Sequence, residues 1–234
     1  MKKSPLTITL ILFALFFAYT CACLMVDVAQ FAPQSVNGDA IESTQTTDIG
    51  FQKLNLSVHN ALGFRQVFYR LSEYIGYLAL LAGACIGLIW LLRLIKTKKL
   101  LGVDAGLNAA IAAMALMVVF YVLFEALKLN FRPVILDDGL EASYPSSHTL
   151  LGCVVFGCAA MVSADIFKDK GLARSVSALC YIIAAVLTLF RALSGVHWIS
   201  DIIGGVILSA AILSLAHFIK YVLTEMPEKQ PQAR

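Results

Sequence analysis

The segment from Arg191 to Asp201 places an arginine, a histidine and an aspartate close together in a mostly apolar chain. His197 and Asp201 are four residues apart, so on a helix that begins near His197 they share one face and can hydrogen-bond. Asp201 can then hold one ring nitrogen of His197 and leave the other free to attack. Arg191 lies across a short turn that Gly195 makes easy. Because a guanidinium fork suits a phosphoryl group, this segment predicts phosphate chemistry.

A second polar segment lies upstream, at the end of another apolar run. It contains Arg132 and Pro133, followed by Tyr144-Pro145-Ser146-Ser147-His148. A serine after a proline is typical of a helix N-cap, and a helix N-terminus also binds phosphate. Ionisable side chains near a membrane are costly and usually functional. The two segments together hold the parts of an anion site with acid–base chemistry.

The composition is that of an integral membrane protein. The chain has 234 residues, of which 59% are hydrophobic and 14% charged, whereas soluble domains carry about 25% charged residues. The net charge of +3 is too small to indicate binding to nucleic acid. The six cysteines all fall in apolar segments, which favours small hydrophobic side chains over a disulfide framework.

We expect an all-α fold of six transmembrane helices that form a single domain, residues 1–234. A run of about 20 apolar residues is long enough to span a bilayer. The expected spans cover residues 6–28, 74–95, 105–127, 147–167, 176–193 and 199–223. The charged start of the first run also resembles a signal peptide, but its length favours an uncleaved helix.

Two polar segments lie outside these spans. Residues 27–72 are expected to form a loop, in which apolar residues from Phe51 to Phe68 recur at near-helical spacing. This pattern predicts an amphipathic helix, either on the membrane surface or packed on its own protein. Residues 224–234 are expected to form a polar tail.

The distribution of basic residues predicts the orientation. The amino terminus, the loop near Lys98, the loop near Lys170 and the tail carry the basic excess, and six spans place all four on one side. The positive-inside rule makes that side cytoplasmic. Both termini are then cytoplasmic, and both polar segments face the extracytoplasmic side of a plasma or inner membrane.

The order and spacing of these residues resemble the three-part signature of the type 2 phosphatidic acid phosphatase superfamily. The three parts are Arg132-Pro133, Pro145-Ser146-Ser147-His148, and Arg191 with His197 and Asp201 after five and three intervening residues. The superfamily includes bacterial lipid phosphatases, undecaprenyl pyrophosphate phosphatases and vanadium haloperoxidases. The expected number of six spans is similar to that of the bacterial membrane branch of this superfamily.

The first motif departs from the superfamily pattern. A lysine normally stands seven positions before the arginine, and this sequence has Glu125 there. Lys128 lies one helical turn nearer and would share a face with Arg132 on a continuous helix. Lys128 either supplies the missing charge or extends to the lipid headgroups, and Glu125 can instead pair with a basic side chain.

The resemblance implies a lipid phosphatase that acts on a phosphate monoester or pyrophosphate, with a membrane lipid phosphate as its partner. His197 attacks phosphorus, Asp201 holds its ring, and His148 serves as acid and base. Arg132, Arg191, Ser146, Ser147 and Lys128 are the candidate phosphate-binding residues. No metal or other cofactor is implied, although a histidine four residues before an aspartate can also be a metal pair.

Two alternatives remain at this level. A lipid acceptor could replace water, which would make the protein a phosphotransferase. A non-catalytic lipid-binding or transport protein could use the same scaffold, although the presence of His148, Arg191, His197 and Asp201 weakens that interpretation.

Overall fold

The computed structural model describes residues 5–35, 46–136 and 139–225. The helices are α1 (Pro5–Met25), α2 (Gln52–Leu62), α3 (Gln66–Thr97), α4 (Ala105–Leu127), α5 (Ser147–Ile166), α6 (Lys170–Ser194) and α7 (Ile199–Glu225), with a short 3-10 turn at Leu100–Gly102. The strands are β1 (Ala29–Phe31), β2 (Gln34–Ser35), β3 (Thr47–Ile49) and β4 (Val134–Ile135). The predicted all-α class is confirmed.

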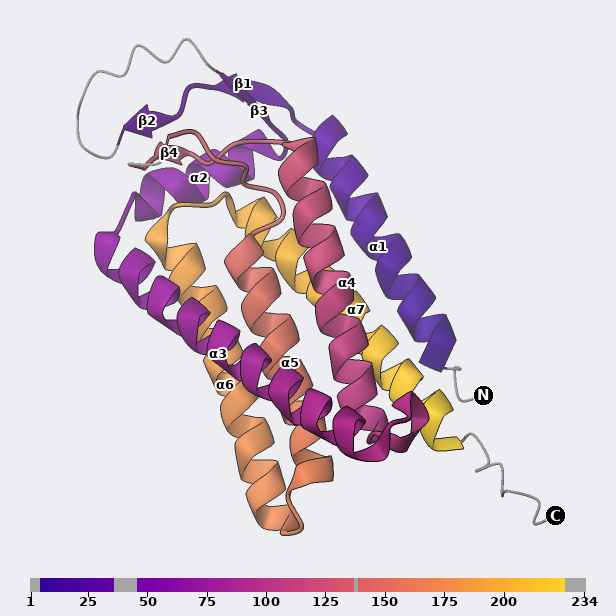
Figure 1. Cartoon of the computed structure of the whole chain (residues 1–234). Helices are drawn as coiled ribbons and strands as arrows, with labels where there is room; N and C mark the ends of the chain where they lie inside the picture. The colour runs from indigo at the N-terminus through magenta and orange to yellow at the C-terminus, as the bar shows by residue number, and fades with distance from the viewer. Residues whose placement is uncertain (1–4, 36–45, 137–138, 226–234) are drawn as a thin grey trace, which may run out of the picture.

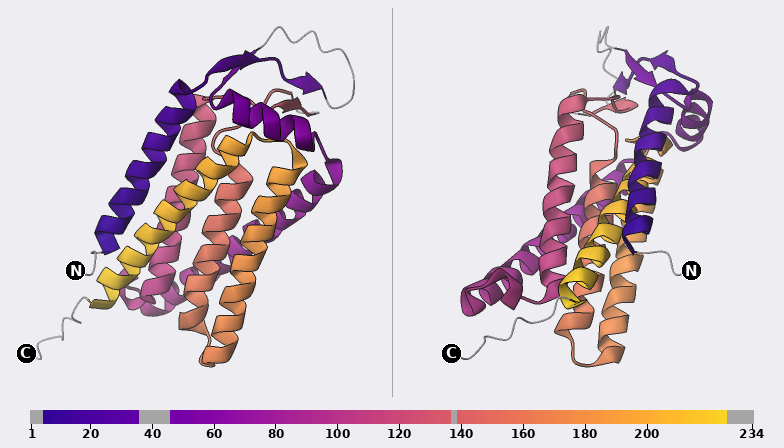
Figure 2. Two further views of the ribbon diagram at one scale, coloured as in Figure 1. Left: turned by 180° about the vertical axis from the view of Figure 1, so that it is seen from behind. Right: turned by 90° about the vertical axis from the view of Figure 1, so that its right-hand side faces the viewer.

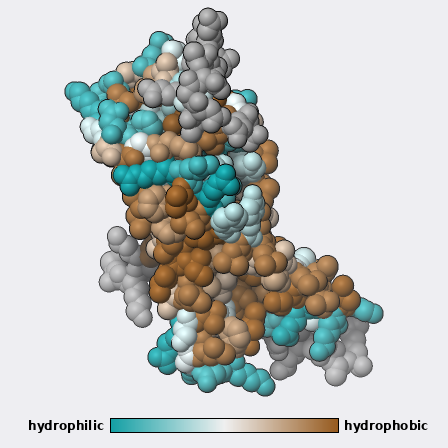
Figure 3. Space-filling model, turned by 90° about the vertical axis from the view of Figure 1, so that its left-hand side faces the viewer, coloured by the Kyte–Doolittle hydropathy of each residue, from teal (hydrophilic) through white to brown (hydrophobic). Residues whose placement is uncertain are grey.

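Within the described residues, six helices are long and apolar enough to cross a membrane. They are α1 and α3 to α7, so the predicted number of spans is confirmed. Figure 3 shows an apolar region on one face of the molecule between two more polar ends. The chain is therefore an integral membrane protein.

Helix α5 lies at the centre of the bundle and packs against α3, α4, α6 and α7 (Figure 1). Its buried side chains join the main apolar core, whereas the apolar side chains of α1 and α3 are largely exposed, as lipid contact requires. Helices α1 and α7 pack together, and the start of α1 lies at the same end of the bundle as the end of α7 (Figure 2). The opposite end carries α2 and the strands.

Helix α3 is longer than the sequence predicted. It has 32 residues and begins at Gln66, eight residues before the expected start at Tyr74. At 1.5 Å per residue it is about 48 Å long, more than the hydrocarbon thickness of about 30 Å. It crosses the bundle obliquely over α6, α5 and α4 (Figure 1), as an over-long span does. The predicted loop 27–72 is therefore wrong at its end, because residues 66–72 belong to this helix.

Helix α2 lies over the end of the bundle where α7 begins, and it packs against α7. The buried Asn55 side chain accepts a hydrogen bond from the Ser200 backbone N–H at 3.1 Å and donates to the Ser200 hydroxyl at 2.9 Å. The ring of His59, on the same helix, lies 5.5 Å from the ring of Trp198 between their centroids. The amphipathic helix is therefore confirmed in type, and it packs on its own protein.

The short strands were not predicted. Strand β1 pairs with β3 in antiparallel register, and β2 pairs with β4 in parallel register. Each strand has only two or three residues, too few for an alternating pattern to stand out in the sequence. Their effect is to tie the segment after α1 to the segment that carries Arg132.

The turn between α6 and α7 depends on Gly195. This residue has φ +70°, and the Arg65 backbone N–H donates to the Ser194 carbonyl at 2.9 Å beside it. A Cβ at Gly195 would overlap the Gly63 carbonyl oxygen of the α2–α3 connection. Glycine is thus required for both its backbone conformation and its close approach.

We predict that Gly195→Ala lowers the thermal stability of the purified protein, because the turn must move away from Gly63. Overpacking of this kind costs about 1–3 kcal/mol, and the left-handed backbone adds to it. Thermal unfolding in detergent measures the effect. Gly87→Ala on α3 is the matched control, since a Cβ there meets nothing within 4 Å. Equal melting temperatures for the two variants would contradict this description of the turn.

Candidate functional site

The site lies at the end of the bundle where α5 and α7 begin and α6 ends. Arg191 is in the last turn of α6, His197 lies in the α6–α7 turn, and Asp201 is in the first turn of α7. His148 is in the first turn of α5, and Arg132 lies in the segment between α4 and α5. Segments far apart in the sequence therefore bring these five residues to one end of the molecule.

A serine hydroxyl joins His197 to Asp201. The ring Nδ1 of His197 lies 3.9 Å from the nearer Asp201 oxygen, which is too far for a hydrogen bond. The Ser143 Oγ lies 3.0 Å from that Nδ1 and donates to Asp201 Oδ2 at 2.5 Å. The predicted direct hydrogen bond between His197 and Asp201 is therefore wrong, because α7 begins at Ile199 and leaves His197 in the preceding turn, although the two side chains remain neighbours.

The single proton of the Ser143 hydroxyl determines the state of His197. Since that proton goes to the carboxylate, the oxygen can accept only from an N–H, which places the ring proton on Nδ1. The Nε2 atom then carries its lone pair, and it has no hydrogen-bond partner among the described residues. Burial, and then the charges of Arg132 and Arg191, lower the pKa of His197 well below its usual value. The ring is therefore neutral near pH 7, as a nucleophile must be.

Asp201 is fully buried and is held by three further donors. Its Oδ1 accepts from the Asn130 amide at 3.0 Å, and its Oδ2 accepts from the Trp198 backbone N–H at 3.0 Å. The Ser200 hydroxyl lies 3.5 Å from Oδ1. These contacts satisfy a carboxylate that burial would otherwise penalise.

Arg191 is fully buried, and its guanidinium is engaged along one edge. Its NH1 donates to Glu73 Oε1 at 2.7 Å and to the Ser72 hydroxyl at 3.1 Å. The Tyr69 ring lies 5.4 Å from its central carbon. Its Nε and NH2 make no hydrogen bond within the described part of the chain. That free edge has the geometry that binds two phosphoryl oxygens side by side.

Arg132 has a similar arrangement. It is 7% exposed, and its NH2 lies 2.7 Å from Glu141 Oε2, whereas its buried Nε has no partner in the described ranges. Each arginine of the site is thus paired with one glutamate. Within the part of the chain that the structure describes, Arg191 keeps two buried donor groups free and Arg132 keeps one, and such donors are able to bind an anion.

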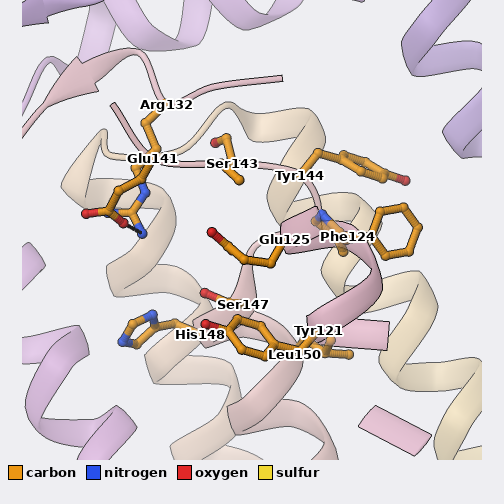
Figure 4. Close-up of a pocket in the computed structure, with 12 residues that line it drawn as sticks. Tyr121, Phe124, Glu125, Arg132, Glu141, Ser143, Tyr144, Ser147, His148 and Leu150 are labelled. Atoms are coloured by element: carbon orange, nitrogen blue, oxygen red, sulfur yellow. Dashed lines mark ion pairs between the residues drawn. The ribbon is translucent and has the colours of Figure 1, made fainter. Parts of the chain in front are cut away.

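A polar cavity of about 200 Å³ lies between the α4–α5 segment and the start of α5 (Figure 4). Its lining includes Arg132, Glu141, Ser143, Ser147 and His148, and the Glu125 carboxylate points toward its middle. The cavity therefore brings together the serine beside His197, one arginine and the second histidine.

Three predicted phosphate-binding residues do not line this cavity: Arg191, Ser146 and Lys128. Helix α4 ends at Leu127, so Lys128 has a left-handed backbone, is exposed, and does not share a helical face with Arg132. The premise of a continuous helix is therefore wrong. Ser146 is fully buried as the N-cap of α5, where its hydroxyl accepts from the Thr149 backbone N–H. Ser147, by contrast, lines the cavity.

Three residues of the site were missed in the sequence. Glu73 lies one residue before the expected start of the second span, and Ser143 and Glu141 lie in an irregular segment without periodicity. The available signal was weak: Glu73 is an acidic residue within one turn of a long apolar run, where a charge is costly unless it is paired.

A group of three or more His, Cys, Asp or Glu side chains arranged to hold a metal is not found among the described residues.

Comparisons with known proteins concern the family and the fold. Residues 127–224 match the family model of the PAP2 superfamily. A crystal structure described as the first transmembrane PAP2 type phosphatidylglycerolphosphate phosphatase from Bacillus subtilis is similar in fold, with a TM-score of 0.59. The similarity covers 95% of this chain and 98% of that one, at 18% sequence identity. No curated protein sequence matches the chain. Residues 127–224, the part of the chain that matches the PAP2 superfamily model, hold both histidines, both arginines and Asp201.

Proposed function

We propose that the protein is a lipid phosphatase that hydrolyses a phosphate monoester or pyrophosphate through a phosphohistidine at His197. The observation that carries the proposal is the free Nε2 of His197. Ser143 and Asp201 orient the ring from its Nδ1 side, and burial together with the charges of two arginines keeps the pKa of the ring low. The free donors of Arg191 and Arg132 supply the complementary binding of a phosphoryl group.

The residues support a two-step reaction. In the first step, Nε2 of His197 attacks phosphorus in line, the bond to the leaving oxygen breaks, and His148 gives that oxygen a proton. In the second step, water gives a proton to His148 and attacks phosphorus, which breaks the P–N bond and restores His197. The free edge of Arg191 and the Nε of Arg132 bind the equatorial oxygens, where the transition-state charge is spread.

An apolar groove next to His148 supports a lipid substrate. The groove has a volume of about 500 Å³ and is lined by side chains of α3, α4 and α5. Leu80, Met117 and Leu151 form part of its apolar wall, and His148 and Glu73 lie at its polar end. A hydrocarbon chain in this groove would place an attached phosphate beside His148.

Three substrate classes fit a groove and a phosphate site of this kind. They are phosphatidylglycerophosphate, for which the structurally similar Bacillus subtilis phosphatase is named, phosphatidic acid, and a polyprenyl pyrophosphate. Each combines a long hydrocarbon chain with a terminal phosphoryl group. Lys128 is exposed, and its long side chain can extend to contact lipid headgroups.

We further propose that the site faces the extracytoplasmic side. The α3–α4 and α5–α6 connections lie at the end of the bundle opposite the site. Lys98, Lys99, Lys168 and Lys170 are in or next to these connections. The positive-inside rule places that end in the cytoplasm.

The purified protein should release inorganic phosphate from at least one of the three lipid classes in detergent. His197→Ala should abolish release while lipid phosphate binding is retained, because both arginines remain. Phosphate release and equilibrium binding of a labelled lipid measure the two properties. Unchanged release by His197→Ala would contradict the assigned nucleophile. Transfer of phosphate to an added lipid acceptor without release would identify a phosphotransferase instead.

Ser143→Ala should lower kcat by about tenfold to a hundredfold. The serine donates to a charged carboxylate, and such a bond is worth about 1.5–3 kcal/mol, at about 1.4 kcal/mol per tenfold in rate. Steady-state kinetics on the best lipid substrate measure the change. Ser57→Ala on α2 is the matched control, because its exposed hydroxyl donates to the Lys53 carbonyl of its own helix. A Ser143→Ala enzyme as fast as the control would show that Asp201 acts on His197 without the serine.

A further inference from the structure

One face of α3 contacts both Arg191 and His148. Tyr69, Ser72, Glu73 and Gly76 follow one another at helical spacing and so lie on the same side of the helix. Tyr69, Ser72 and Glu73 contact Arg191, and Glu73 and Gly76 contact His148. This helix lies outside the part of the chain that matches the family model, residues 127–224.

A single oxygen of Glu73 joins the two site residues. Its Oε1 lies 2.7 Å from Arg191 NH1 and 3.2 Å from His148 Nε2. An ionised carboxylate only accepts hydrogen bonds, so the Nε2 of His148 must carry a proton. The proton that His148 exchanges during the reaction must therefore be on its other nitrogen, Nδ1.

The surroundings of His148 agree with this assignment. Its Nδ1 is buried and has no hydrogen-bond partner within the described residues. A Cβ at Gly76 would lie 2.9 Å from the ring Cδ2 and 3.3 Å from Nε2, so the Nε2 edge of the ring packs against the α3 backbone. The ring is thus held on its Nε2 side by α3, and Nδ1 is the nitrogen left for the substrate.

The negative charge of Glu73 also has an electrostatic role. Protonated His148 and Arg191 are like charges close to one carboxylate oxygen, and their repulsion is strong where water is scarce. The carboxylate between them offsets that repulsion when His148 carries its second proton. The neutral amide of glutamine has nearly the same shape and cannot do this.

We propose that Glu73 is a positioning residue that orients His148 so that Nδ1 delivers the proton to the leaving group. The inference rests on the proposed phosphatase function. Glu73 also accepts a hydrogen bond from Arg191 NH1, and the amide oxygen of a glutamine at this position can keep that contact. The two histidines then work through opposite nitrogens: His197 is held at Nδ1 and attacks through Nε2, and His148 is held at Nε2 and transfers protons through Nδ1.

The test compares Glu73→Gln with the wild type on two substrates. One is the best lipid phosphate, whose alkoxide leaving group needs a proton, and the other is p-nitrophenyl phosphate, whose leaving group does not. Glu73→Gln should lower the rate of phosphoenzyme formation from the lipid, followed by rapid quench, by about tenfold to a hundredfold, within the range that general acid catalysis supplies. The loss on the aryl phosphate should be much smaller. A purely structural role would lower both rates equally.

Two further single variants and one double variant complete the experiment. Glu141→Gln is the matched control, because this glutamate pairs with Arg132 and should affect the two substrates to the same degree. Gly76→Ala displaces the His148 ring without a change in charge and should reproduce the leaving-group dependence even if Glu73→Gln folds poorly. In the His148→Ala background, Glu73→Gln should cause no further loss on the lipid, since residues that act as a unit are not additive.

The possible failures are distinguishable. A wild type that releases no phosphate from any lipid would contradict the proposed function itself. An active wild type in which Glu73→Gln slows both substrates equally, or multiplies the loss in His148→Ala, would overturn the positioning role alone.

Discussion

The arrangement of this site depends on buried charges that need partners at one end of an apolar bundle. Arg191 is fully buried and Asp201 is fully buried, and neither could lie there without compensation. Glu73, Ser72 and Tyr69 surround the guanidinium, and Ser143, Asn130 and the Trp198 backbone surround the carboxylate. These contacts connect α3, the α4–α5 segment, α6 and α7. The polar requirements of two side chains thus fix the relative positions of most of the elements that form the site.

In the proposed mechanism, the same contacts separate the roles of the two histidines. His197 is buried, is neutral and has a free Nε2, because Ser143 accepts from its Nδ1 and two arginines oppose a positive ring. His148 instead lies 3.2 Å from a carboxylate oxygen of Glu73. The proposed mechanism assigns attack to His197 and proton transfer to His148, two roles that require opposite protonation states. Helix α2 also contacts this region, since Asn55 hydrogen-bonds to Ser200, the residue next to Asp201.

Much of this could be predicted from the sequence, and the exceptions have physical causes. Apolar runs separated by basic loops are sufficient to count six spans, and α4 has the predicted bounds, residues 105–127. The start of α3 was misplaced because its first turns carry Arg70 and Glu73, and hydropathy cannot show that Glu73 is paired. His197 was placed on a helix with Asp201, but the chain needs a turn around Gly195 before α7 can begin. The Ser143 bridge fills the gap that results, and a contact between loop residues 54 positions apart leaves no periodic pattern.

The phosphohistidine is the central claim, and rapid quench with a labelled lipid phosphate tests it most directly. We expect a phosphoenzyme that is stable in base and labile in acid, that forms and decays within one turnover, and that maps to a peptide containing His197. The His197→Ala protein should form none. The absence of a trapped adduct during steady turnover, or an adduct located on His148, would contradict this mechanism.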